Sequence, residues 1–393
     1  MSAAFAVVLT SLVGLALIYP LLPFLALALG ASPLAVAALL AVDTLVTLLI
    51  APFWGYLSDV VGRRPLLLLA LALATLSYPL LAIADSIALL FVSRALAGLG
   101  LGALPVLTAY VADRTSHRGR LAGVAGVNAA YSFAFVIGPL LLLLSYDPVS
   151  ADVTLPVALA MFVGLASFLL AAWGLDYRSL SSSRGNWAAA SIGWFGLGGG
   201  LRRPWAAPLW TITAFALVYA IIDATLGVWA KARLAWTPHE LSIAFLFAGA
   251  AAGLAQILVV VPACRRWSER AVAGWSGAAM LAGLMLLALL PTSLNAYLAM
   301  ALLGAGVASG CSCLTSLVSK TAPSDSQGLA MGMVQSGLSL ARVVGPLWGG
   351  FALQQLGVTW HFAAALAVMG LTVAAAASLP EARGIAASRA AEN

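Results

Sequence analysis

The feature that most constrains this chain is a series of long apolar runs separated by short polar segments. Each run is long enough to cross about 30 Å of hydrocarbon as a helix. Most of the connections are so short that consecutive helices must be antiparallel neighbours. The runs lie at residues 3–29, 33–58, 65–84, 86–112, 120–145, 153–175, 208–230, 238–263, 271–291, 294–319, 327–353 and 357–379. We therefore predict an all-α membrane protein with twelve transmembrane helices.

The composition agrees with a chain that is mostly embedded in lipid. Hydrophobic residues make up 63% of the 393 residues and charged residues only 8%, and the mean hydropathy is +1.05. A soluble domain carries about 25% charged residues, so the composition excludes a water-soluble fold. Although the net charge is +6, we expect no nucleic-acid partner, because the basic residues follow membrane topology.

The basic residues lie mainly on one side of the predicted membrane. Lys231 and Arg233 fall on the other side, and Arg94 and Arg342 lie inside runs. The remaining 15 of the 19 Lys and Arg are Arg63, Arg64, Arg114, Arg118, Arg120, Arg178, Arg184, Arg202, Arg203, Arg265, Arg266, Arg270, Lys320, Arg383 and Arg389. The positive-inside rule makes their side cytoplasmic. We expect both termini there, in a multi-pass protein of a cell membrane.

One long connection divides the chain into six runs and six runs. We expect an N-terminal half at 1–175, a cytoplasmic linker at 176–207, a C-terminal half at 208–380 and a cytoplasmic tail at 381–393. An internal repeat with an offset of 206 or 207 residues supports this division. The repeat relates Gly98, Gly100, Asn128, Gly138 and Pro139 to Gly304, Gly306, Gln335, Gly345 and Pro346.

A short charged segment joins the second and third runs. Its sequence is Gly55-Tyr56-Leu57-Ser58-Asp59-Val60-Val61-Gly62-Arg63-Arg64-Pro65. Glycine lets backbones approach closely, and proline can begin the next helix in its first turn. The segment resembles the loop signature of the major facilitator superfamily, G-x-L-x-D-x-x-G-R-[RK]-x, at every defining position.

This resemblance implies a transporter built from two six-helix halves, with the substrate site near the bilayer midplane. Over essentially its whole length the chain resembles drug:proton antiporters of the tetracycline-exporter type. The resemblance also implies a set of residues that serve the conformational cycle. These are Gly55, Asp59, Gly62, Arg63, Arg64 and Asp113.

Arg94 lies about eight residues inside the fourth run, where an isolated arginine costs roughly 2.5–3.5 kcal/mol on insertion scales. It should therefore face the bundle interior and have a partner. The sequence Arg94-x-x-x-Gly98-x-Gly100 resembles the arginine motif of proton-coupled members of the superfamily. That resemblance implies proton transfer or substrate binding; the alternative is a structural arginine bonded to a neighbouring helix.

Asp43 and Asp223 are the acids deep within the predicted runs. A buried carboxylate can bind and release a proton, because burial disfavours its charged form unless a cation lies close. Asp43 could instead be a paired acid that joins two helices. Tetracycline-type exporters generally carry acids in spans 1, 3 and 9, where this chain has none, so its proton route departs from theirs.

The antiporter motif G-x-x-x-G-P-x-x-G-G is divided between two runs. Run five keeps Gly138 and Pro139, whereas run eleven holds the complete end of the motif, with Gly345, Pro346, Gly349 and Gly350. Proline removes a backbone donor and bends a helix, and glycine allows close packing. The motif is typical of exporters.

We expect Asp43, Arg94, Asp223, Arg342, Asn128 and Gln335 to carry protons or contact substrate. The sequence thus predicts a monomeric secondary transporter, most plainly a proton-coupled drug exporter of a bacterial inner membrane. It is not expected to be an enzyme or to need a metal or cofactor, since the proton gradient supplies the energy. The alternatives are a facilitator or importer of sugars or other small metabolites and, more remotely, a polytopic enzyme or receptor.

Overall fold

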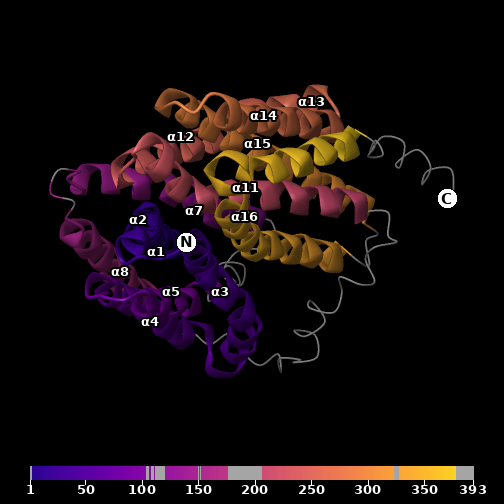
Figure 1. Cartoon of the computed structure of the whole chain (residues 1–393). Helices are drawn as coiled ribbons and strands as arrows, with labels where there is room; N and C mark the ends of the chain where they lie inside the picture. Colours follow the sequence, from indigo (N-terminus) through magenta and orange to yellow (C-terminus); the bar gives the residue numbers. More distant parts are fainter. Residues whose placement is uncertain are drawn as a thin grey trace, which may run out of the picture. The chain divides into compact units, whose positions relative to one another are not determined.

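The computed structural model describes residues 2–102, 106–107, 110, 120–148, 150, 152–175, 206–322 and 327–377, and these are almost entirely helical (Figure 1). Within them, eight helices are long and apolar enough to cross a membrane. Shorter apolar helices lie at Ile87–Leu101, Phe133–Ser145 and Phe362–Ala376. The prediction of an all-α membrane protein is confirmed, and the count of twelve spans stays a prediction.

The helices follow the predicted runs closely. In chain order they are α1 (Ser2–Ile18), the 3₁₀ turn η1 (Tyr19–Leu21), α2 (Leu22–Ala28), α3 (Pro33–Val61), α4 (Arg63–Ala82), α5 (Ile87–Leu101), α7 (Arg120–Ser145), α8 (Thr154–Gly174), α11 (Ala206–Leu234), α12 (Pro238–Leu254), the π-helix η2 (Ala255–Val260), α13 (Val261–Arg266), α14 (Glu269–Leu289), α15 (Ser293–Thr321) and α16 (Gln327–Ala377).

Local sequence explains where several helices begin. The Ser32 hydroxyl accepts a hydrogen bond from Ala35 N at 3.2 Å at the start of α3. The Ser268 hydroxyl does the same for Ala271 N at 3.3 Å at the start of α14. Such caps satisfy backbone donors that have no partner within the helix.

Four predicted runs differ from the observed helices. The first run is divided by a 3₁₀ turn at Tyr19–Leu21, where Pro20 removes a backbone donor. The eighth run is divided by η2, which the sequence did not indicate. Runs eleven and twelve are joined as α16, but Gly357 has a non-helical backbone with φ of 77° and separates two helical parts.

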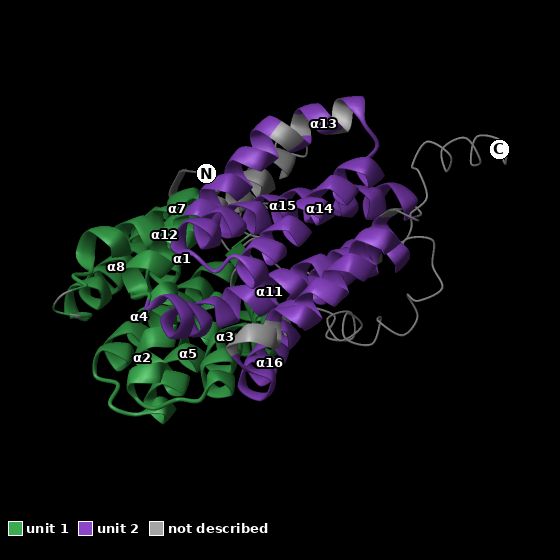
Figure 2. Cartoon of the chain, turned by 45° about the horizontal axis from the view of Figure 1, so that its top comes forward, with its two compact units in different colours: residues 1–191, 236–246 green, residues 192–235, 247–393 purple. Residues whose placement is uncertain are grey.

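The chain forms two compact units (Figure 2). Unit 1 comprises Met1–Ser191 with Trp236–Leu246, and unit 2 comprises Ile192–Ala235 with Phe247–Asn393. The predicted linker at 176–207 and the tail at 381–393 lie outside the described residues, except for Ala206 and Ala207. The predicted domain boundaries therefore stay predictions.

Within each unit the helices pack in a repeated pattern. In unit 1, α1 packs against α7 and α8, α4 packs against α5 and α8, and α3 packs against α5. In unit 2, α11 packs against α16, and α14 packs against α15 and α16. The 206-residue sequence repeat is thus also a repeat of helix contacts.

The repeated glycines are places where two helices touch backbone to backbone. A Cβ added to Gly98 on α5 would lie 2.5 Å from the carbonyl oxygen of Asp43 on α3. A Cβ added to Gly304 on α15 would collide in the same way with the carbonyl oxygen of Ala248 on α12. Small residues at such positions let membrane helices approach closely.

The second glycine of each motif, Gly100 or Gly306, contacts the helix on the other side of α5 or α15. A Cβ on Gly100 would lie 2.7 Å from the Ala70 carbonyl oxygen on α4, and a Cβ on Gly306 would lie 2.7 Å from the Ser276 carbonyl oxygen on α14. Ala70 and Ser276 are themselves related by the offset of 206 residues. Each motif therefore holds one helix between two others.

Replacing these glycines by alanine should lower stability, because the added methyl group forces packed backbones apart at a cost of roughly 1–3 kcal/mol. We expect Gly98→Ala and Gly304→Ala to lower the thermal unfolding temperature of the purified protein. Gly274→Ala on α14 is the matched control, since a Cβ there meets no described residue within 4 Å. It should be neutral or stabilising, because alanine favours helix. Equal unfolding temperatures for all three variants would contradict the packing argument.

Candidate functional site

A buried ion pair joins Arg94 on α5 to Asp43 on α3. The distance from Arg94 Nη2 to Asp43 Oδ2 is 2.5 Å, and the two side chains are only 1% and 7% exposed. The other carboxylate oxygen of Asp43 accepts hydrogen bonds from the Thr44 backbone N–H at 2.6 Å and from the Thr44 hydroxyl at 3.3 Å. Asp43 is therefore held at both oxygens, and its charge is matched by a cation.

The partner that the depth of Arg94 requires is thus an acid on a neighbouring helix. Arg94 Nε is buried and has no hydrogen-bond partner among the described residues. An unsatisfied buried donor costs about 1–3 kcal/mol. The two charges are therefore paired, but one buried donor of Arg94 has no acceptor among the described residues. Arg94 can thus form a further hydrogen bond if its surroundings change.

Close packing of α5 between its neighbours places the two charges together. The Thr47 hydroxyl on α3 donates to the Gly98 carbonyl at 2.9 Å, and Trp54 Nε1 on α3 donates to the Leu99 carbonyl at 2.7 Å. On the other side of α5, the Ser93 hydroxyl donates to the Ser77 carbonyl on α4 at 2.7 Å. The glycine contacts and these hydrogen bonds fix the register of Arg94 against Asp43.

The second unit repeats this packing without the charges. Gly304 meets Ala248 as Gly98 meets Asp43, so Ala248 stands where the acid is in the first unit. The position 206 residues after Arg94 is Met300, which is fully buried. The ion pair is therefore not part of the packing that both units need.

The signature segment is more helical than predicted. α3 continues through Gly55 to Val61, and Gly62, with φ of 102°, ends it by donating its backbone N–H to the Ser58 carbonyl at 3.1 Å. Among the described residues, a Cβ on Gly55 meets nothing within 4 Å, so the close backbone approach at Gly55 stays a prediction. Gly62 is needed for its positive φ.

The two arginines of this segment begin α4. Arg64 donates from Nη2 to the Ala172 carbonyl near the end of α8, so it ties two helices of the same unit together. Arg63 is half-buried. The Asp59 side chain and all of Asp113 lie outside the described residues, so the predicted cluster of Asp59, Arg63 and Asp113 stays a prediction.

The remaining polar candidates lie on two helices of unit 2. Asp223 is half-buried on α11, and Arg342 and Gln335 are exposed on α16. α11 and α16 pack against each other. The Asn128 side chain lies outside the described residues. Arg342 and Gln335 are thus accessible to a ligand in a way that Arg94 is not.

The Gly-Pro motifs lie at another repeated helix contact. A Cβ on Gly138 of α7 would lie 2.5 Å from the Ala16 Cβ on α1, and a Cβ on Gly345 of α16 would lie 2.8 Å from the Ala220 Cβ on α11. A Cβ on Gly349 would lie 3.1 Å from the Ile221 carbonyl oxygen. Gly350 and both prolines, Pro139 and Pro346, are buried inside the same helices.

The structure also shows a polar contact that sequence reasoning missed. Gln256 lies in the π-helix η2 and donates from Nε2 to the Ala308 carbonyl at 2.8 Å and to the Ser312 hydroxyl at 2.7 Å, both on α15. π-helices are rare and frequently occur at functional sites. An amide inside an apolar run was the available signal, but its spacing does not reveal the extra residue in the turn.

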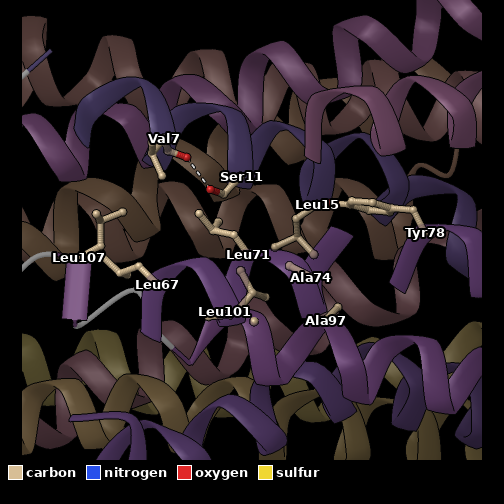
Figure 3. A pocket seen from close by; sticks show the side chains of 12 residues that line it. Val7, Ser11, Leu15, Leu67, Leu71, Ala74, Tyr78, Ala97, Leu101 and Leu107 are labelled. Atoms are coloured by element: carbon tan, nitrogen blue, oxygen red, sulfur yellow. Dashed lines mark hydrogen bonds between the residues drawn. The ribbon is translucent and has the colours of Figure 1, made fainter. Parts of the chain in front are cut away.

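A small cavity lies inside unit 1, among residues of α1, α4 and α5 (Figure 3). Figure 3 shows the Ser11 hydroxyl donating to the Val7 carbonyl, and it shows Tyr78 beside Leu15, away from this hydrogen bond. The volume of the cavity, about 30 Å³, can hold no more than one or a few water molecules. The cavity is therefore not the site of a drug-sized substrate.

Comparisons with known proteins agree with the helix pattern and the signature segment. The chain matches the Major Facilitator Superfamily over residues 4–255 and 212–392. It is 28% identical to the class C tetracycline resistance protein of Escherichia coli, over 90% of this chain and 91% of that protein.

Solved structures show the same fold. A nucleoside transporter superposes with a TM-score of 0.77 at 13% identity, covering 95% of this chain and 98% of the transporter. A D-xylose–proton symporter superposes with a TM-score of 0.74 at 14% identity, covering 97% and 98%. Identities this low relate the folds and not the substrates.

Removing one member of the ion pair should destabilise the protein by about 3–5 kcal/mol, because the other charge is left buried and uncompensated. We expect Arg94→Leu to lower the unfolding temperature strongly in detergent. The double variant Arg94→Leu with Asp43→Leu should recover most of that loss, since apolar pairs of similar volume often replace buried ion pairs without cost. A double variant as unstable as the single variant would show that the two charges are not coupled.

Proposed function

We propose that this chain, which belongs to the Major Facilitator Superfamily and is a multi-pass membrane transporter rather than an enzyme, is a proton-coupled drug exporter. Its substrate would be a hydrophobic or amphiphilic compound with a partial charge, exported across a bacterial inner membrane. The protein acts as a monomer with both termini in the cytoplasm. The proton gradient is its energy source, without a metal or cofactor.

The observation that carries proton coupling is the buried pair of Asp43 and Arg94. Arg94 favours the charged form of Asp43, so a proton that binds Asp43 must displace the guanidinium group. Arg94 must then find another partner or remain uncompensated. Either outcome changes the free energy of the contact between α3 and α5 by several kcal/mol. A single proton thereby biases one helix contact of unit 1, as a coupled transporter requires.

The asymmetry of the repeat supports this assignment over a purely structural role. Both units pack their glycine motifs in the same way, yet the second unit does so with Ala248 and Met300 in place of charges. Because unit 2 joins the equivalent helices without charges, an ion pair that served only to join α3 and α5 would be dispensable. A pair that changes its protonation state has a reason to occur in one unit alone.

The drug-like substrate is supported by two observations. Over most of its length the chain is similar to a tetracycline resistance protein. The deep polar residues are also few for a sugar site, in which each hydroxyl buried without a partner costs about 1–3 kcal/mol. We assign Arg342 and Gln335 on α16 to orienting the substrate among apolar walls, and Asp223 on α11 either to the same role or to binding the proton.

Proton coupling can be tested in proteoliposomes with Asp43→Asn and Asp223→Asn. At the coupling residue the amide cannot release a proton, so that variant should keep counterflow exchange but lose accumulation driven by a pH gradient. Asp85→Asn, in the exposed segment between α4 and α5, is the control and should keep both activities. Full gradient-driven accumulation by both Asp43→Asn and Asp223→Asn would reject coupling through these carboxylates.

The substrate class can be tested by expressing the protein in an antibiotic-sensitive bacterium. We expect resistance to at least one amphiphilic antibiotic, with tetracycline the first to try, and expect Arg94→Ala to remove it. Arg233→Ala, at the exposed end of α11, should leave resistance unchanged at matched expression. If a broad panel shows no change in sensitivity while labelled sugars accumulate in the cells, the importer alternative holds instead.

A further inference from the structure

Two tryptophans form an exposed pair where α13 meets α14. The rings of Trp267 and Trp275 are in edge-to-face contact, with centroids 4.9 Å apart and planes at 75°. Their exposed fractions are 49% and 51%. Neither indole N–H donates to a residue that the structure describes. Half-exposed indoles with free donors suit a membrane–water interface, where the ring contacts lipid and the N–H meets a polar group.

Basic residues lie close to Trp267 in the sequence. Arg266 is exposed and directly precedes Trp267, and Arg270 lies in the first turn of α14. The nearby acid, Glu269, forms an ion pair with Lys320 at the end of α15. Arg266, Arg270 and Lys320 thus outnumber Glu269, so these four residues give the corner a net positive charge.

At the corresponding corner of unit 1, the equivalent side chains are similarly exposed but are aliphatic rather than aromatic. The positions 206 residues before the tryptophans are Val61 and Leu69, which are 55% and 48% exposed. Aliphatic side chains there can face lipid tails but cannot donate hydrogen bonds. The exposed positions are thus repeated, whereas the aromatic donors occur only in unit 2.

We propose that the corner formed by Arg266, Trp267, Arg270 and Trp275 is a binding site for an anionic phospholipid. The guanidinium groups bind the headgroup phosphate, and an indole N–H donates to the phosphate or to an ester carbonyl. The acyl chain lies along the exposed ring faces on α14. Side chains on a helix tilt towards its N-terminus, so Trp275 is directed back to the headgroup side, which the basic residues predict to be cytoplasmic.

Charge is what selects the lipid in this arrangement. Each basic residue near the surface favours an anionic over a zwitterionic lipid by about five-fold. Two arginines therefore favour phosphatidylglycerol over phosphatidylcholine by an order of magnitude or more. The tryptophans add affinity that depends little on headgroup charge, and they report on the bound lipid through their fluorescence.

The test uses the full-length protein in phosphatidylcholine bilayers that contain a small fraction of brominated lipid, because bromine quenches tryptophan fluorescence on contact. Brominated phosphatidylglycerol should quench the wild-type protein more than brominated phosphatidylcholine at the same fraction. That excess should be lost in the double variant Trp267→Phe with Trp275→Phe. It should also be lost in Arg266→Gln with Arg270→Gln, which keeps both tryptophans.

Trp348→Phe is the matched control, since Trp348 on α16 is 48% exposed and belongs to a different helix. The excess quenching by phosphatidylglycerol should survive in this variant. Equal quenching of the wild-type protein by the two brominated lipids would overturn the proposal. So would an excess that persists in either double variant, provided that circular dichroism shows each variant to be folded.

Discussion

Inside a bilayer, burial of apolar side chains does not drive helices together, because lipid tails are as apolar as leucine. The helices of this protein must therefore associate through close contact and hydrogen bonds. The glycine motifs of α5 and α15 provide that contact at Gly98 and Gly304, where a carbonyl oxygen of the neighbouring helix occupies the space a side chain would need. The rest of each unit is arranged around these contacts.

The buried ion pair depends on this packing and adds something to it. Arg94 reaches Asp43 because Gly98, one turn further along α5, brings the α3 backbone within contact distance. Since unit 2 keeps the packing and lacks the charges, the pair is an addition to a repeated framework. This separation between framework and charge is why we assign the pair to coupling and the glycines to structure.

The two copies of the segment between neighbouring helices have diverged in a similar way. Gly62 and Arg64 in unit 1 provide a positive φ and a hydrogen bond from α4 to α8. The equivalent positions in unit 2 are Ser268, which caps α14 through its side chain, and Arg270. The second segment ends its helices without glycine, and its chemistry is consistent with contact to lipid rather than with a conformational change.

By itself the sequence determined the class of protein, the positions of the helices and the family. Length and hydropathy decide whether a segment crosses a bilayer, and the segment from Gly55 to Pro65 carries enough fixed positions to be specific. It also showed that Arg94 needs a partner, because an unpaired charge deep in a bilayer is costly. The identity of that partner could not be read from the chain.

Only the tertiary structure decided which distant residues meet. Asp43 and Arg94 are 51 residues apart, and Arg64 and Ala172 are 108 apart, so no local pattern relates them. The π-helix at Ala255–Val260 was equally hidden. Helix formation is governed by local sequence, whereas the contacts of a side chain are set by how whole helices pack. In this chain that packing depends on a few glycines, and the sequence does not show which residues of other helices they contact.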